Sequence, residues 1–312
     1  MGPSTSALDQ AAIHFSPESL HLLNVTLAGL MFAVSLFIER DQVTHLRRHP
    51  RALAAGLLAQ WLYMPLMATL LVLLLKPPPH LALGLLLVAA CPGGNVSNFL
   101  SLWARGNVPL AISLVAVSTL AAPLATPALF TLTAQSVVAA GALPPLQIDL
   151  LGVWITTFCV VALPLLLGTA LKHQKPQLAS RLRKPLRTLS GLLLLSFIVV
   201  GFADNFALFI AHIGTLFGWV FLLNTLAIVG GYTIARACRL PEADRRALAI
   251  ETGIHNSGLG LVLIFNYFNG AGAMALIVAW WSVWDILSGG VVAAWWSRRP
   301  LPAEAGATAG LP

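Results

Sequence analysis

Residues 91–98 read CPGGNVSN and residues 251–258 read ETGIHNSG, and each stretch lies within an otherwise apolar segment. Pro92 has no backbone N–H and its ring clashes with the preceding helical turn, while paired glycines tolerate non-helical dihedral angles. The two stretches therefore predict two helices that are interrupted near their middles. Glu251 is an ionisable group within such a segment, where a charge is costly enough to indicate a functional role.

The composition around these stretches is that of a membrane protein. Hydrophobic residues make up 58% of the 312 positions and charged residues only 9%. So few charges cannot cover a soluble globule of this size, because an ordinary soluble domain has about a quarter of its residues charged. The basic residues lie between apolar segments, which argues against nucleic acid binding. The three cysteines form no CxxC pair, so we expect neither a disulfide framework nor a structural zinc site.

Apolar windows bounded by charges or by Pro and Gly clusters predict an all-α, polytopic fold. Residues 1–16 form an extramembrane N-terminal tail in this prediction, residues 17–299 a transmembrane domain, and residues 300–312 a disordered C-terminal tail. The transmembrane domain has nine predicted helices, which are 18–38, 51–75, 79–103, 107–135, 147–172, 186–206, 209–236, 245–268 and 271–297.

The distribution of basic residues sets the predicted orientation. If the first loop is cytoplasmic, only Lys76 of the 18 Lys and Arg residues falls on the outer side. Because cytoplasmic loops of membrane proteins are enriched in Lys and Arg, this places the N-terminus outside and the C-terminus inside. We expect the protein in the inner (plasma) membrane as a multi-pass protein.

The third and eighth predicted helices, which contain the two interruptions, run in opposite directions. Two interrupted helices of opposite orientation are typical of inverted-repeat transporters, in which they meet near the middle of the membrane. The N-termini of the half-helices present amide donors to an anion, and the freed carbonyl groups suit a cation. The pattern therefore favours a symporter, a secondary transporter that moves two solutes together.

Structural explanations exist for several of these residues. The interruption at 91–98 could be a kink whose Asn and Ser side chains bond neighbouring helices. Gln60 could serve a helix–helix hydrogen bond, and for Asp285 we favour a structural role over one in transport.

Several stretches, in order along the chain, resemble the bile acid:sodium symporter family, including its bacterial members. They are residues 91–98, 104–108, 117–123, 251–259 and 282–284. The resemblance implies two crossed discontinuous helices in a core domain, a panel domain that moves against it, and a substrate crevice between the two. It also implies the nine-span type of this family, in agreement with the outer N-terminus.

The resemblance further implies two sodium sites behind the crossing of the broken helices. The matching residues are Ser97, Asn98 and Glu251 for the first site, and Gln60, Glu251, Thr252, Ile254 and His255 for the second. Asn95 and Asn256, at the crossing, are the candidates for substrate contact.

Two departures from the family pattern affect these sites. The hydroxyl ligands expected on the fourth helix fall on Ala111 and Val115, and the usual glutamine of the second site falls on His255. Sodium prefers oxygen ligands, by the argument that governs other hard cations, so one sodium site is favoured over two. His255 could instead carry a proton, because imidazole changes its charge in the range of cellular pH gradients. Whether it carries a proton or stays neutral beside one sodium ion remains open at this point.

We therefore expect a symporter of a small or amphipathic organic anion that works by alternating access. Na⁺ is the expected coupling ion and H⁺ the alternative, with no organic cofactor and no nucleic acid partner. A proton-coupled or ion-independent carrier of the same fold is the alternative function. A carrier for arsenite or auxin-like acids fits the motifs less well, and no HExxH motif favours an enzyme. The sequence does not set the oligomeric state.

The orientation can be tested by cysteine labelling. In a variant without Cys91, Cys159 and Cys238, a cysteine introduced within 173–185 should react with a membrane-impermeant maleimide only after the cells are opened. A cysteine introduced beside Lys76 is the control, and it should react in intact cells because this position is predicted to lie outside. Labelling of the 173–185 region from outside intact cells would contradict the nine-span arrangement.

Overall fold

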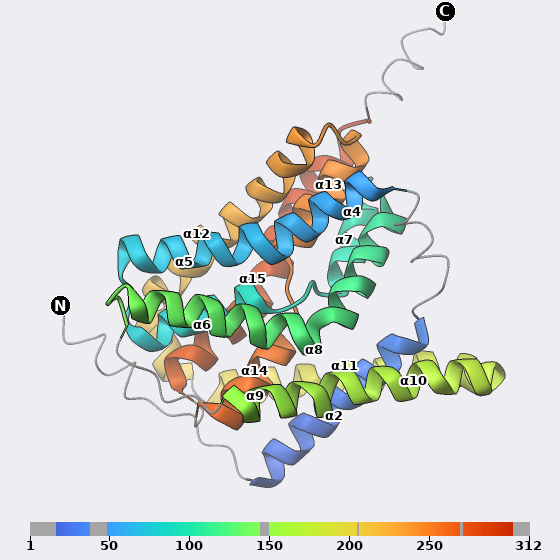
Figure 1. Ribbon diagram of the computed structural model, residues 1–312, viewed down its shortest axis with the longest axis horizontal. Helices are drawn as coiled ribbons and strands as arrows, with labels where there is room; N and C mark the ends of the chain where they lie inside the picture. The colour runs from blue at the N-terminus through green and yellow to red at the C-terminus, as the bar shows by residue number, and fades with distance from the viewer. Residues whose placement is uncertain (1–16, 38–48, 144–149, 205, 269–270, 302–312) are drawn as a thin grey trace, which may run out of the picture.

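The computed structural model describes residues 17–37, 49–143, 150–204, 206–268 and 271–301, and helices account for nearly all of this part (Figure 1). The predicted tails at 1–16 and 300–312 lie outside it, apart from Pro300 and Leu301. The helical segments, in chain order, are α2 (Pro17–Phe37), α4 (Pro50–Leu57), η1 (Leu58–Tyr63), α5 (Met64–Leu75), α6 (Pro79–Ala90), α7 (Val96–Trp103), α8 (Val108–Ala139), α9 (Leu150–Thr157), η2 (Phe158–Ala162), α10 (Leu163–Gln174), α11 (Pro176–Asp204), α12 (Phe206–Ala237), α13 (Glu242–Gly253), α14 (Ser257–Tyr267) and α15 (Gly272–Ser297).

Each of the nine predicted ranges contains helix, but some helices begin or end at residues other than those predicted. The helix α8 continues to Ala139, and α11 begins at Pro176, ten positions before the predicted start. Within the described ranges, six helical segments are long and apolar enough to cross a membrane. These segments support a multi-pass membrane protein. The number of crossings and their orientation stay predictions.

The surface is as apolar as a lipid environment requires. Large hydrophobic side chains are exposed along several helices, for example Leu74 at 74%, Leu124 at 68% and Val291 at 71%. A soluble monomer rarely exposes extended apolar patches of this kind. The buried interior is also apolar, with Trp281 and Phe130 among the largest fully enclosed side chains. The polar groups that are buried therefore stand out as candidates for function.

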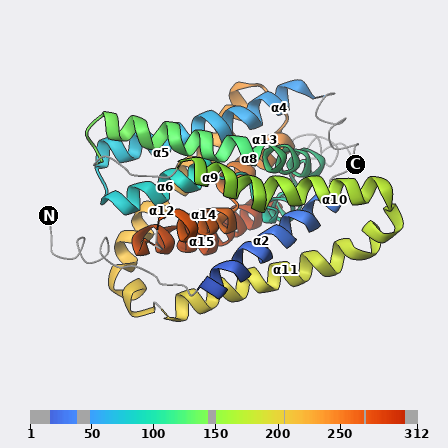
Figure 2. The same cartoon turned by 60° about the horizontal axis from the view of Figure 1, so that its bottom comes forward.

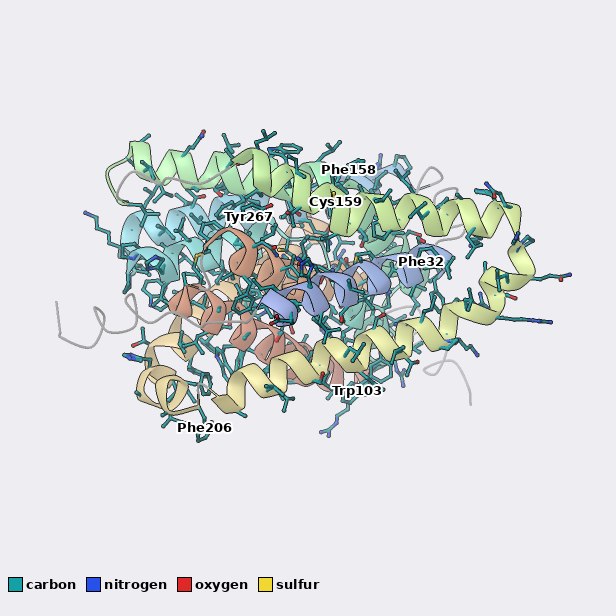
Figure 3. All side chains as sticks on the ribbon, turned by 90° about the horizontal axis from the view of Figure 1, so that it is seen from below. Phe32, Trp103, Phe158, Cys159, Phe206 and Tyr267 are labelled. Carbon is teal, nitrogen blue, oxygen red and sulfur yellow. The ribbon has the colours of Figure 1, made fainter. Side chains whose placement is uncertain are left out.

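Two groups of helices can be distinguished by their packing. The helices α2, α10 and α11 pack mainly on one another, and α2 runs between the other two (Figure 2). Figure 3 looks onto this group and onto η2, which packs on α2 and α10 and carries the exposed Phe158 and Cys159. The second group contains α12 packed on α13, and α6 between α8 and α15. The two groups meet where α9 and η2 pack on α8, where α2 and α9 pack on α14, and where α11 packs on α12 and α15.

Both predicted interruptions are present. A short extended segment at 91–95 separates α6 from α7, and another at 254–256 separates α13 from α14 (Figure 1). Cys91 has φ −73° and ψ 151°, and Ile254 has φ −114° and ψ 117°, so both are in the extended region. Each interrupted helix is therefore two half-helices joined by a strand-like piece.

Two helices contain a wider turn of π type that the sequence did not predict. The turn η1 ends two residues before Pro65, and η2 ends two residues before Pro164. Proline cannot donate to the carbonyl one turn earlier and clashes with it, so a locally widened helix relieves the conflict. The residues of such a turn are displaced around the helix, which changes the direction in which their side chains point.

A pair of glycines on α12 sets the distance between three helices. The ring of Tyr63, at the end of η1, packs where a Cβ on Gly230 would stand, and its hydroxyl donates to the Leu226 carbonyl at 2.9 Å. A Cβ on Gly231 would lie 2.5 Å from Thr252 Oγ1 and 2.7 Å from the Leu248 oxygen of α13. Close packing at this pair therefore brings η1 and α13 to the same stretch of α12.

Substituting Gly231→Ala should separate α12 from α13. The added methyl group meets backbone that cannot yield cheaply, and overpacking of this kind costs about 1–3 kcal/mol. We expect a lower midpoint of thermal unfolding in detergent. Gly218→Ala, on the same helix, is the matched control, because its Cβ would meet no atom within 4 Å. Equal midpoints for the two variants would show that the close approach at Gly231 is not required.

Candidate functional site

The two extended segments are paired with each other by backbone hydrogen bonds. Gly93 and His255 form an antiparallel bridge. The Gly94 N–H donates to the Ile254 carbonyl at 3.0 Å, and the Asn256 N–H donates to the Pro92 carbonyl at 2.8 Å. An unsatisfied backbone group is costly away from water, so each interruption is stabilised by the other. This pairing fixes the point at which the two broken helices cross.

Glu251 lies beside this crossing, in the last turn of α13. Its side chain is 1% exposed, and both carboxylate oxygens accept hydrogen bonds from other elements. Oε1 accepts from Gln60 Nε2 of η1 at 2.9 Å, and Oε2 accepts from Ser97 Oγ in the first turn of α7. The structure thus brings three of the predicted site residues into one buried cluster, although they are far apart in the sequence.

Gly93 allows the cluster to form against the backbone of the crossing. A Cβ at this position would occupy the place of Glu251 Oε1 and would lie 3.0 Å from Gln60 Nε2. Any side chain here would displace the carboxylate or the amide. Gly93, in the first interruption, therefore leaves room for Glu251 of the second broken helix, because the carboxylate packs directly on this glycine.

Several oxygens in this region suit a hard cation. Gln60 Oε1 and Asn98 Oδ1 are buried and have no hydrogen-bond donor within the described part of the chain. Gln60 Oε1, the carboxylate of Glu251 and the hydroxyl of Ser97 form a donor set of oxygens only, and Asn98 follows Ser97 in α7. Hard cations such as Na⁺ prefer oxygen ligands, so this set fits sodium. The described residues contain no group of three or more His, Cys, Asp or Glu side chains, the usual ligands of a transition metal.

The remaining predicted ligands follow Glu251 along the chain. Thr252 is buried and its Oγ1 donates to the Leu248 carbonyl at 2.7 Å. The carbonyl of Ile254 accepts the Gly94 N–H in the crossing. The imidazole of His255 is 5% exposed and packs edge-on against Trp281, with ring centroids 5.7 Å apart. Among the described residues neither of its ring nitrogens has a hydrogen-bond partner, so it is not bonded to Glu251.

Asn95 and Asn256 precede the two half-helices that start at the crossing. Both are half-buried, whereas Gly94, His255 and Ser257 beside them are buried. Asn256 caps α14, because its Oδ1 accepts from the Leu259 N–H at 3.3 Å, whereas Asn95 makes no such cap on α7. Helix N-termini carry a partial positive charge and free amide donors. The two asparagines therefore stand where the crossing is most suited to an anion.

The two positions at which the family resemblance implies hydroxyl ligands lie on α8. Ala111 and Val115 are both buried there, at 0% and 3% exposure. Neither has a side-chain oxygen to offer a cation. The side-chain oxygens described near the crossing are therefore those of Glu251 and of its partners from η1 and α7.

Two polar residues support the crossing from neighbouring helices, and one of them, Asn224, was not singled out from the sequence. Asp285 of α15 accepts the His255 N–H at 3.3 Å through Oδ2, so it bonds a partner segment as the structural interpretation expected. Asn224 of α12 donates to the Gly253 carbonyl at 2.8 Å and accepts from Ser288 Oγ at 2.7 Å. An asparagine inside the apolar 206–237 segment was the available signal.

Comparison with known proteins identifies relatives along most of the chain. The sequence model of the sodium bile acid symporter family matches residues 24–212 of this chain. An uncharacterized sodium-dependent transporter of Bacillus subtilis, YocS, is 31% identical over 288 residues, which cover 91% of this chain and 85% of that protein. The probable chloroplastic sodium/metabolite cotransporter BASS1 of Arabidopsis thaliana is 32% identical over 287 residues, covering 90% and 68% of the two chains.

A human relative is also similar. The ileal sodium/bile acid cotransporter of Homo sapiens is 29% identical over 241 residues, which cover 76% of this chain and 67% of that protein. All three relatives are named as transporters, not enzymes, and this confirms the prediction of a transport protein. Since the similarity covers both broken helices and most of the apolar segments, the chain belongs to the sodium bile acid symporter family.

Proposed function

We propose that this protein is a sodium-coupled symporter of a small or amphipathic organic anion, with one principal sodium site at Glu251. The observation that carries the proposal is the buried carboxylate, held between Gln60 and Ser97 beside the crossing. A buried ionised carboxylate is costly unless it is paired with a cation or well hydrogen-bonded. Here the fold supplies two hydrogen bonds and further unpaired oxygens, so a cation completes the arrangement.

The helix ends at the crossing support the same assignment. The half-helices α6 and α13 end there, and helix C-termini carry partial negative charge. Glu251 lies in the last turn of α13, where a carboxylate alone is unfavourable and a neighbouring cation is favourable. The half-helices α7 and α14 begin at the same place, and their positive ends favour an anion near Asn95 and Asn256. Cation and anion thus favour each other's binding, as symport requires.

Alternating access requires two parts that move against each other. We assign the moving panel to α2, α9, η2, α10 and α11, and the core to the other helices, because these sets pack mainly within themselves. They are linked by a few polar contacts. Asn24 and Asn266 exchange hydrogen bonds of 3.2 and 3.0 Å between α2 and α14, and Thr156 bonds Tyr267 between α9 and α14. Such contacts can be exchanged for water at modest cost when the parts separate.

We infer the substrate class from the names of the relatives and from the partial positive charge of the helix N-termini at the crossing. The named relatives are transporters of metabolites or bile acids with sodium, and the crossing offers amide donors to an anion. We infer a bile acid, keto acid or pantoate-like acid as substrate, carried across the inner membrane. A screen of such anions by thermal shift, with and without sodium, would identify it. A stabilising anion whose effect does not depend on sodium would favour the ion-independent facilitator instead.

Glu251→Ala should abolish sodium-driven uptake and the rise in thermal stability on adding NaCl, with insertion in the membrane unchanged. The physical reason is that the carboxylate is the shared member of both candidate ion sites. Uptake is measured in proteoliposomes with an inward sodium gradient, and stability is compared between NaCl and choline chloride. Asp285→Asn is the control, because it keeps an acceptor for the His255 N–H and should retain most of both effects. Near-normal sodium-dependent uptake by Glu251→Ala would show that this carboxylate is not required for sodium coupling.

The geometry of His255 favours sodium over proton coupling. The ring is buried, has no acceptor among the described residues and is not bonded to Glu251, so an imidazolium would be unpaired. We expect uptake to follow a sodium gradient and to ignore an inward acid gradient imposed without sodium. His255→Gln should keep sodium-dependent uptake, since glutamine supplies an oxygen at the same position. Uptake driven by the acid gradient alone, and lost in His255→Gln, would establish proton coupling instead.

A further inference from the structure

A groove lined partly by basic and partly by apolar side chains lies on α11 beside the end of α2. It encloses about 520 Å³ and is lined by Phe37, Lys184, Arg187, Thr188, Gly191, Leu192 and Leu195. One end of the groove is basic and the other end is aliphatic. None of the residues assigned to the ion or substrate sites takes part in it. The groove therefore needs an explanation of its own.

Within the described ranges, no carboxylate pairs with the cations at the basic end of the groove. The guanidinium groups of Arg183 and Arg187 both stand over the ring of Phe37, with Cζ 5.5 and 5.2 Å from its centroid. Arg183 Nε is buried and has no hydrogen-bond acceptor in the described part of the chain. The lining includes no acidic residue, and Lys184 adds a third positive charge. Like charges held this close repel one another, so an external anion would be attracted.

The aliphatic end continues along the same face of the helix. Leu192 and Leu195 are 60% and 54% exposed. Gly191 lies between the two ends, and a Cβ added there would meet no atom within 4 Å. A hollow thus runs from the cations down an apolar surface that, in this membrane protein, faces lipid or a membrane-embedded space.

We propose that this groove, Phe37 with the α11 residues 183–195, binds the headgroup and one acyl chain of an anionic phospholipid. The phosphate group would be held by Lys184, Arg187 and the hydroxyl of Thr188, and the chain would lie over Gly191 and Leu195. Basic pockets between helices at the cytoplasmic interface are suited to anionic lipid headgroups. Since Phe37 ends α2 and the other groove residues lie in the middle of α11, the lipid would hold the end of α2 against the middle of α11.

The test uses the full-length protein in detergent, titrated with phosphatidylglycerol or phosphatidylcholine, with thermal stability and native mass spectrometry as readouts. The wild type should show a saturable stabilisation by phosphatidylglycerol and retain that lipid in the gas phase, with a much smaller effect of phosphatidylcholine. Lys184→Gln combined with Arg187→Gln should weaken the apparent affinity for phosphatidylglycerol about 30-fold, since each basic residue contributes about fivefold in such sites.

Two further variants control for the change in net charge and for poor folding of the double variant. Lys175→Gln combined with Arg236→Gln makes the same change in net charge at exposed positions outside the groove and should leave the affinity unchanged. Gly191→Leu fills the hollow without altering charge and should also weaken binding, which tests the site even if the double variant folds poorly.

Three outcomes would overturn the proposal. Equal affinity of the two double variants for phosphatidylglycerol would show that the groove is not the site. Equal stabilisation by soluble glycerophosphate would mean a phosphate site without a lipid chain. Equal stabilisation by phosphatidylcholine would mean that the groove does not select an anionic headgroup.

Discussion

The hydrogen bonds between the two interrupted helices determine where every group of the site can stand. Gly94 donates to Ile254 and Asn256 donates to Pro92, so each break satisfies backbone groups of the other. A single break would leave backbone groups unpaired inside an apolar interior, at a cost of several kcal/mol for each group. The crossing therefore explains why two interruptions occur together. It also explains why four helix ends, two of each sign, meet at one point.

The polar cluster depends on that crossing and on close packing around it. Glu251 reaches Ser97 because the last turn of α13 lies against the first turn of α7, and it fits there because Gly93 has no side chain. Gln60 reaches the same carboxylate from η1, which Tyr63 anchors against Gly230 of α12. Asp285 and Asn224 hold the second break from α15 and α12. A cation site at Glu251 would thus be sensitive to any relative movement of these helices, as a coupled transporter requires.

The sequence predicts the helices and the two breaks because Pro92 with its glycines, and Glu251 within an apolar segment, have direct local causes. The family resemblance adds Gln60 and Ser97, which no periodicity would connect to Glu251. The wide turn before Pro65 could not be predicted, since a proline inside the predicted helix 51–75 is equally compatible with a simple kink. The position of the His255 ring against Trp281 depends on tertiary packing with α15, and so does the support from Asp285. Local patterns carry no information on such contacts.

Hydrogen exchange measured by mass spectrometry tests most directly whether a sodium ion binds at the crossing of the two breaks. The amides of Gly94 and Asn256 bond across the crossing, and a cation bound to Glu251 should make their opening rarer. We predict that NaCl, compared with KCl at equal ionic strength, slows exchange in peptides covering 91–98 and 251–258, and leaves peptides of α10 unchanged. Exchange at the crossing that is the same in both salts, while uptake still depends on sodium, would place the ion elsewhere and contradict this account.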